Sequence, residues 1–345
     1  MTTRTAAARL PIERGINPII VKELRSRMRG ARAFITLTVA LLLIAGFSFV
    51  LYRLVLVSSQ FSYSPLSPQI GQTLFAGLSF LELMIISTIT PAITAGAISG
   101  EKEKQTYEML LATPLHPFSI LWGKLISALG YVFLMIFAAV PMLSLIFIFG
   151  GMTTRDMLKT LALLTVIAVM FGVIGMFMSA VFGRTGRATA AAYLVGMVML
   201  FGPILIGAGI SLLSQSGPPR WLLAFSPLSA LASAFSSTVN LQNISSMINI
   251  FGYPMRWMWG APEISLTEIP RPIYHYSLPL FGGITLVLYA ITTRLVRSFN
   301  RWRIQWSEIL VVLIVTVGFI GLIYIAYLAT AFRYENFLLY NMVNP

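Results

Sequence analysis

The sequence predicts an all-α polytopic membrane protein with about seven membrane-spanning helices. Hydrophobic residues make up 57% of the 345 residues and charged residues only 10%, whereas about 25% of the residues of a soluble domain are charged. Seven apolar runs approach or exceed the roughly 20 residues that cross a bilayer. Lysines and arginines gather at the ends of these runs, as they do in membrane proteins. A soluble fold of this length could not bury so much apolar surface.

The same composition excludes several other classes of protein. The net charge of +13 does not indicate nucleic-acid binding, because the basic residues flank apolar runs and do not form one face of a soluble module. The chain has no cysteine, and its two histidines, His116 and His275, are far apart. We therefore expect no disulfide, no thiol nucleophile and no metal site. The first 32 residues lack the apolar core and small-residue cleavage site of a signal peptide.

The predicted spans follow from the apolar runs taken in order. Each run is long enough to cross about 30 Å of hydrocarbon, and the third is longer than it needs to be. The seven spans cover Ala33–Val57, Leu74–Ile98, Ile120–Phe149, Leu158–Phe182, Ala188–Leu213, Leu278–Val296 and Ile309–Ala331.

The distribution of basic residues predicts the orientation of these spans. With a cytoplasmic N-terminus, 17 of the 24 lysines and arginines lie on the cytoplasmic side and seven on the other. Positive charge favours the cytoplasmic side. The expected location is therefore the cytoplasmic (inner) membrane, with the N-terminus in the cytoplasm and, after seven spans, the C-terminus outside it.

A basic region, residues 1–32, precedes the first span. Asn17 and Pro18 form a helix start, an N-cap followed by proline at the first helical position. In NPIIVKELRSRMRG, apolar and basic residues recur at helical spacing, which predicts an interfacial helix on anionic lipid. A plain basic flank of the first span is the alternative. The basic residues that would contact lipid headgroups are Lys22, Arg25, Arg27, Arg29 and Arg32.

The segments outside the spans define the remaining organisation. Residues 33–213 hold spans one to five, and residues 214–277 form a long extracytoplasmic loop. In this loop WLLAFSPLSALASAF is apolar but is interrupted by Pro227, so we expect a re-entrant segment packed against protein. Residues 278–331 hold the last two spans, and residues 332–345 form a short extracytoplasmic tail.

The loop between the second and third spans, residues 99–119, is unusually charged. The helical pattern of the second span continues without a break to Thr113 and Pro114, and Glu101, Lys104, Gln105 and Glu108 would share one stripe of it. The prolines of TPLHP then enforce a corner. Such a short corner could dock in a groove of a partner protein. An ordinary solvated loop with internal charge pairs is equally compatible with the pattern.

This loop resembles the corresponding segment of ABC-2-type transporter permeases. The matching residues are Glu101, Glu103, Thr106, Leu110, Leu111, Pro114, Gly123 and Lys124. The segment NPIIVKELRSRMRG is similar to the "elbow" helix of that family. The resemblance implies that the corner, with Glu108 and Pro117 included, is a coupling helix that seats in a cytoplasmic ABC ATPase subunit. The family core has six spans and an inner C-terminus, so either the last helix is an addition or one of the segments assigned to the extracytoplasmic side is misassigned.

The resemblance also implies the function. The chain would be the permease subunit of an exporter, working as a homodimer or with a paralogous permease. It has no phosphate-binding loop, because Gly96–Lys102 lacks the required spacing, and it is not expected to be an enzyme. We expect it to bind no cofactor itself and ATP and Mg²⁺ to bind to the partner ATPase. A stand-alone carrier driven by an ion gradient is the alternative function.

Polar residues inside the second span are candidates for a translocation path. Glu82 is a carboxylate within an apolar run, a placement that is costly and usually faces a bundle interior. Ser87, Thr88 and Thr90 follow, although their hydroxyls can equally bond the carbonyls of the preceding turn. Pro91 can kink the helix. Gly96 and Gly100 are expected to allow close helix packing.

Overall fold

The computed structural model describes residues 23–24, 31–59, 67–111, 117–148, 150, 152–214, 220–235 and 273–297. All regular structure in these residues is helical, and six helices are long and apolar enough to cross a membrane. The chain is therefore a multi-pass membrane protein. The candidate spans are Phe34–Arg53, Gly71–Glu103, Phe118–Ile148, Thr154–Val181, Thr185–Ile210 and Tyr274–Val296.

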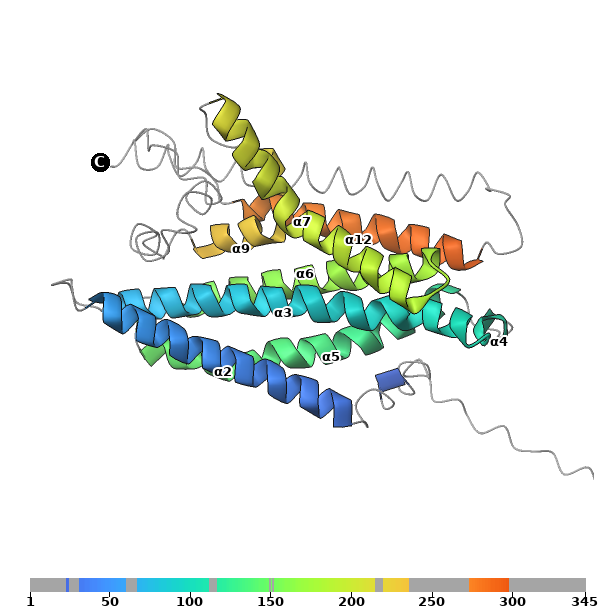
Figure 1. Cartoon of the computed structure of the whole chain (residues 1–345), viewed down its shortest axis with the longest axis horizontal. Helices are drawn as coiled ribbons and strands as arrows, with labels where there is room; N and C mark the ends of the chain where they lie inside the picture. Colours follow the sequence, from blue (N-terminus) through green and yellow to red (C-terminus); the bar gives the residue numbers. More distant parts are fainter. Residues whose placement is uncertain are drawn as a thin grey trace, which may run out of the picture.

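The long helices run roughly side by side (Figure 1). Helix α2 covers Ala31–Ser59, α3 covers Ser67–Glu103, and α5 covers Pro117–Leu145 and continues into the short 3₁₀ helix η1, Ile146–Ile148. The short helix α4, Tyr107–Leu111, joins α3 to α5 at one end of the bundle. We call this end the α4 end. Helix α2 contains the first predicted span, and α3 contains the second. Helix α5 together with η1 contains the third, apart from its last residue.

Helix α6, Thr154–Val181, begins at a well-formed cap. The side chain of Thr153 accepts a hydrogen bond from the amide of Asp156, and the carboxylate of Asp156 accepts one from the amide of Thr153. This reciprocal pair satisfies amide donors that have no partner within the helix. Lys159 donates to Asp156 at 3.3 Å. The cap explains why α6 begins four residues before the predicted span.

Two long helices, α7 and α12, and two short ones, α8 and α9, complete the described bundle. Helix α7 covers Thr185–Ser214, α8 covers Arg220–Leu223, α9 covers Pro227–Phe235 and α12 covers Tyr274–Arg297. The apolar segment around Pro227 forms α8 and α9, and α9 packs against α3, α6 and α12. Two buried serines tie this segment to other helices: Ser226, just before α9, donates to Leu200 O at 2.6 Å, and Ser233 of α9 accepts from the Tyr274 amide at 2.9 Å.

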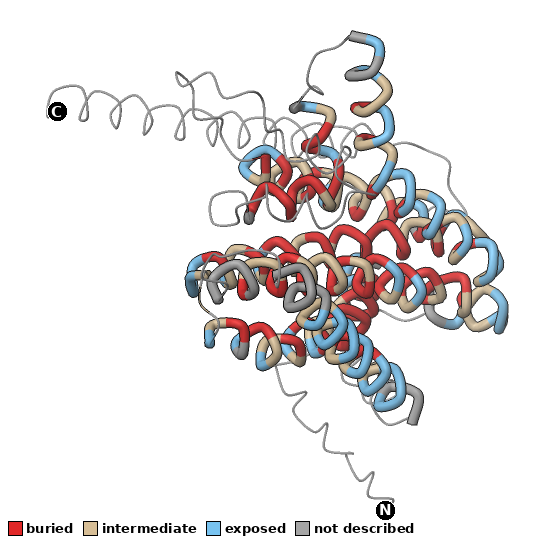
Figure 2. Tube along the Cα trace, turned by 60° about the vertical axis from the view of Figure 1, so that its left-hand side comes forward, coloured by how far each residue is buried: buried red, intermediate tan, exposed pale blue. Residues whose placement is uncertain are grey.

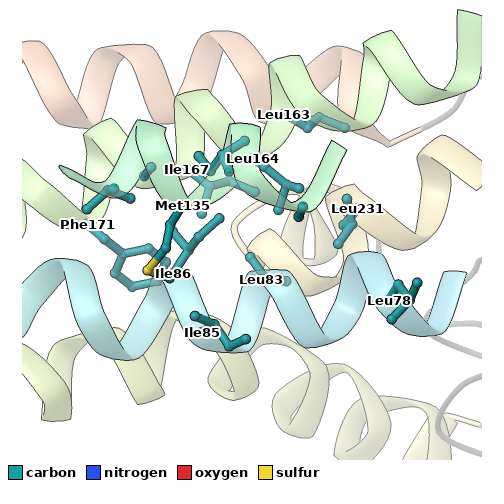
Figure 3. Close-up of a cluster of buried hydrophobic side chains, with 14 of the residues drawn as sticks. Leu78, Leu83, Ile85, Ile86, Met135, Leu163, Leu164, Ile167, Phe171 and Leu231 are labelled. Atoms are coloured by element: carbon teal, nitrogen blue, oxygen red, sulfur yellow. The ribbon is translucent and has the colours of Figure 1, made fainter. Parts of the chain in front are cut away.

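Helices α3 and α6 form the centre of the core. Leu83 and Ile86 of α3 meet Leu164 and Phe171 of α6, with Met135 of α5 beside them (Figure 3). These side chains are at most 6% exposed. The large buried side chains fill the space between the helices, so this part of the bundle is a packed core.

Glycines of α6 allow the close approach of α3. A Cβ added at Gly175 would overlap Oγ1 of Thr94 and lie 3.1 Å from both Cα and O of Pro91. At Gly172 it would lie 3.0 Å from a methyl group of Leu129. The prediction that Gly96 allows close packing is wrong within the described chain, since an added Cβ there meets nothing within 4 Å. The glycines that allow close packing lie on α6.

The apolar residues that remain exposed lie on the outside of the bundle. Helices α2 and α7 carry most of them, and Figure 2 shows exposed residues along the outer sides of the bundle around a buried interior. Leu42, Phe49 and Leu194 are each about two-thirds exposed. A lipid bilayer solvates such surfaces.

Several predicted segments lie outside the described residues. These are the tail 1–16, most of the loop 214–277, the seventh span Ile309–Ala331 and the tail 332–345. The side chains of Lys22, Arg25, Arg27, Arg29 and Arg32 also lie outside them.

Candidate functional site

The candidate site is the corner formed by the end of α3 and by α4, residues 101–111. The helix does not continue to Thr113, so that prediction is wrong: α3 ends at Glu103, and α4 starts at Tyr107. Gln105 adopts the left-handed conformation, with φ of 58°, which a non-glycine residue rarely adopts. The Thr106 amide bonds Glu101 O at 3.0 Å, and its hydroxyl bonds the Glu101 carboxylate. These bonds replace helical ones.

Lys124 is the buried charge that anchors this corner to α5. Its side chain is 5% exposed, and its ammonium donates to Glu101 Oε1 at 2.9 Å and to Ala97 O at 3.0 Å. Glu23, which precedes the first span, lies 3.6 Å from the same ammonium. A buried charge of this kind needs partners to offset its desolvation. Lys124 therefore joins three separate segments at one point.

The segment before α2 also contacts α5 through an apolar residue. A Cβ added at Gly130 would lie 3.3 Å from Cδ1 of Leu24. Glu23 and Leu24 are the described residues of the predicted interfacial helix, and both lie against α5. The helix as a whole stays a prediction, because its other residues lie outside the described part of the chain.

Three further hydrogen bonds join the corner to the end of α6 and the start of α7. Glu103 accepts from the amide and the hydroxyl of Thr185, each at 2.9 Å. Thr185 is the first residue of α7, where a carboxylate complements the helix dipole. Lys102 donates to Ala180 O at 2.6 Å near the end of α6. The Glu103 carboxylate thus binds the start of α7, and the Lys102 ammonium binds α6 near its end.

Tyr107 connects α4 to α12. Its hydroxyl donates to Val296 O at 2.9 Å, and burial raises the pKa of this phenol, so it remains a donor. Tyr289 of α12 donates to Phe118 O at 3.1 Å and packs edge-on against the rings of Phe118 and Trp122. The start of α5 is therefore fixed to α12 as well.

One face of α4 is left free of these contacts. Glu108 is exposed, and Met109 is 75% exposed. The other predicted coupling residues divide into two groups. Glu101, Glu103 and Thr106 are hydrogen-bonded as described above, with Glu103 exposed, whereas the side chains of Leu110, Leu111, Pro114 and Pro117 lie outside the described residues. Their coupling role stays a prediction.

The predicted path residues of α3 do not share one face. Ser87 is buried and donates to Met84 O at 2.9 Å, whereas Thr88 is exposed and bonds Met84 O and Ile85 O. Glu82 and Thr90 are buried and have no hydrogen-bond partner among the residues that the structure describes. Helix α3 continues through Pro91. The structure therefore separates Thr88 from the other members of the set, and the path itself stays a prediction.

Sequence reasoning missed the partners of Lys124 and Glu103. The residues in these pairs are separated by 23 and 82 positions, so no helical spacing rule relates them. A weak signal was available for Lys124 alone, a single cation at the start of an apolar run.

The six apolar helices define a multi-pass membrane protein. At one end of its bundle, hydrogen bonds connect the α4 corner to the neighbouring helices. Comparison with known families identifies it further. The family of ABC-2 family transporter proteins matches residues 17–335, and the chain belongs to this family.

A curated relative agrees with a membrane location. The chain is 30% identical over 129 residues to the uncharacterized membrane protein YdbK of Bacillus subtilis (strain 168). The match covers 34% of this chain and 50% of the relative, so the chain spans about half the length of that protein.

Proposed function

We propose that this chain is the permease subunit of an ATP-binding cassette exporter in the cytoplasmic membrane. A separate cytoplasmic ABC ATPase binds ATP and Mg²⁺, and a second permease copy or a paralogue completes the transporter. Membership of the ABC-2 family supports the transport role. The observation that carries the proposal is the construction of the α4 corner, which is fixed to other helices on one side and free on the other.

The contacts of the corner give it a mechanical role. Glu101, Glu103 and Tyr107 bind α5, α7 and α12, and Lys102 binds the end of α6. A displacement of α4 by the ATPase therefore reaches the ends of four helices through hydrogen bonds and packing. Movement of these helices together changes access to a path beside them.

The distribution of charge supports a cytoplasmic position for the α4 end. Six described basic residues lie near this end, and three lie near the opposite end. Cytoplasmic flanks carry the excess of lysine and arginine. The residues near the α4 end are Lys102, Lys104, Lys124, Arg184, Arg187 and Arg294, and those near the other end are Arg53, Arg155 and Lys159.

Changing the free face of α4 is expected to weaken ATPase binding. In the double variant Glu108→Lys and Met109→Asp, the new charges oppose both the electrostatic and the apolar part of docking. We expect at least about a tenfold loss of affinity, equivalent to about 1.4 kcal/mol. The measurement is binding of the purified ATPase subunit to the permease in nanodiscs. Glu101 is left unchanged because its carboxylate is bonded to Lys124.

The matched control is Arg155→Asp, an exposed residue at the start of α6, at the opposite end of the bundle. It also reverses a charge on the surface, and it should bind the ATPase as the wild type does. Unchanged binding by the α4 double variant, with both variants folded, would overturn the proposed docking face.

A further inference from the structure

Four buried oxygen-bearing side chains lack a hydrogen-bond partner among the described residues. They are Ser79, Glu82 and Thr90 of α3 and Thr160 of α6. Most other buried hydroxyls among the described residues bond a carbonyl of the preceding turn, as Thr94 does with Thr90 O at 2.9 Å. Because buried polar groups are normally bonded, each exception calls for an explanation. The exceptions here gather on two helices that pack together.

Glu82 is the only one of the four that can carry a charge. Its side chain lies inside the bundle with 4% of the residue exposed, and neither carboxylate oxygen has a hydrogen-bond partner in the part of the chain that the structure describes. It lies five residues from the middle of the span Gly71–Glu103, about 7.5 Å along the helix axis. Leu83 and Ile86 beside it are fully buried (Figure 3). An ionised carboxylate in such surroundings has a large desolvation cost.

No described cation offsets that cost. Among the described residues, no lysine or arginine forms an ion pair with Glu82, and the charged groups of the helices packed against α3 lie toward the ends of those helices. Lys124 is bonded to Glu101, and Lys159 to Asp156. The titratable side chains on the packed elements are Tyr52 and Arg53 of α2, Tyr107 and Glu108 of α4, Lys124 and Tyr131 of α5, Arg155, Asp156 and Lys159 of α6, and Arg187 and Tyr193 of α7, with none on η1 or α9.

The register of α3 and α6 places two of the hydroxyls near Glu82. The amides of Ile98 and Ser99 donate to Ser179 Oγ, and Thr94 faces Gly175. Partners along this contact are therefore separated by about 81 positions, and this register puts Thr160 at the level of Ser79. Ser79 is also three residues from Glu82 on α3, a spacing that brings side chains together. Its hydroxyl is an available acceptor for a carboxylic acid O–H group.

We propose that Glu82 is a proton-binding site inside the bundle. It holds a proton in the conformation seen here and releases it when α3 shifts along α6 and water reaches the carboxyl group. On release the O–H bond breaks, its electron pair stays on the carboxylate, and the proton passes to water. The helix that carries Glu82 also forms the start of the α4 corner at its end, so the position of the corner and the state of the proton are linked through this helix.

Infrared spectroscopy of the full chain in lipid membranes tests the bound proton. At pH 7 the wild type should show the carbonyl stretch of a protonated carboxylic acid, and Glu82→Gln should lose it. Glutamine keeps the shape and neutrality of the protonated side chain, so this variant is expected to fold. The control Glu108→Gln changes an exposed carboxylate and should keep the band. A band that survives in Glu82→Gln, or no band in the wild type, would overturn the proposal.

A chemical probe also tests whether Glu82 holds a proton, and it needs no variant. A hydrophobic carbodiimide reacts with protonated carboxyl groups in apolar surroundings, and peptide mapping of the wild type should find Glu82 modified and Glu108 unmodified. Modification of Glu108 with Glu82 intact would contradict the proposal. Both measurements use the permease alone, so their outcome does not depend on the proposed ATPase partner.

The release step rests on the proposed function and needs a separate measurement. When the complex with its ATPase is trapped with ATP and vanadate, the Glu82 band should fall. A band present in the permease alone but unchanged in the trapped complex would overturn the release step. Failure of the ATPase to bind at all would instead contradict the proposed function.

Discussion

Replacing Gly175 with valine is expected to prevent α3 and α6 from packing and to remove most of the folded protein. A Cβ at this position already overlaps Oγ1 of Thr94 and approaches the backbone of Pro91, and the two further methyl groups of valine have no space. Alanine alone should lower the free energy of unfolding by about 1–3 kcal/mol, the usual cost of overpacking. The measurement is the fraction of monodisperse protein after heating in detergent, by size-exclusion chromatography.

Gly96→Ala is the matched control. Gly96 lies on α3, in the same contact region, but an added Cβ there meets nothing within 4 Å. Since alanine favours a helix over glycine by roughly 1 kcal/mol, this variant should be as stable as the wild type or slightly more so. If Gly175→Val remained as stable as Gly96→Ala, the close contact of α3 with α6 would be wrong.

Replacing Lys124 with methionine is expected to loosen the α4 corner from the membrane helices. Methionine fills a similar volume, but Ala97 O loses a donor, and Glu101 and Glu23 lose their cation. Leaving buried polar groups unpaired costs about 1–3 kcal/mol. We expect a fall in stability of that size and a larger fall in ATP-driven transport, because the corner would no longer hold α5. The measurements are thermal unfolding and transport in proteoliposomes.

Lys159→Met controls for the loss of a lysine. Lys159 is more exposed than Lys124, and its partner Asp156 keeps its bonds to Thr153, so its removal should cost less stability than the removal of Lys124. A double-mutant cycle of Lys124→Met with Glu101→Gln separates the pair from its surroundings, and the two effects should be clearly less than additive. Additive effects would show that the two residues do not interact.

The spans could be predicted from sequence because burial in lipid requires continuous apolar helices. For the first six predicted spans the structure has a long helix, and each begins two to seven residues before the predicted start. Local capping explains such differences at α6, where Thr153 and Asp156 form a capping box ahead of the apolar run. Hydropathy reports the apolar part of a helix and not its polar ends.

The interior of the corner could not be predicted, because it depends on contacts between distant residues. The predicted stripe of Glu101, Lys104, Gln105 and Glu108 required one continuous helix. In the structure the helix ends at Glu103, Glu101 binds Lys124, and Glu108 lies on the separate helix α4. The end of α3 depends on the left-handed backbone of Gln105 and on the side chain of Thr106, which a periodicity of apolar residues does not report. Glu82 was recognisable as an unusual residue, but the absence of a described partner required the structure.

The most direct test of the account is the accessibility of a single cysteine placed at Met109. The chain has no cysteine of its own, and Met109 is 75% exposed on α4, so labelling by a membrane-impermeant maleimide reports this position alone. Arg155→Cys reports the opposite end of the bundle. In inside-out vesicles Met109→Cys should be labelled and Arg155→Cys should not, and added ATPase should protect Met109→Cys. Labelling of Met109→Cys only from the extracytoplasmic side, or equal labelling with and without the ATPase, would contradict the account.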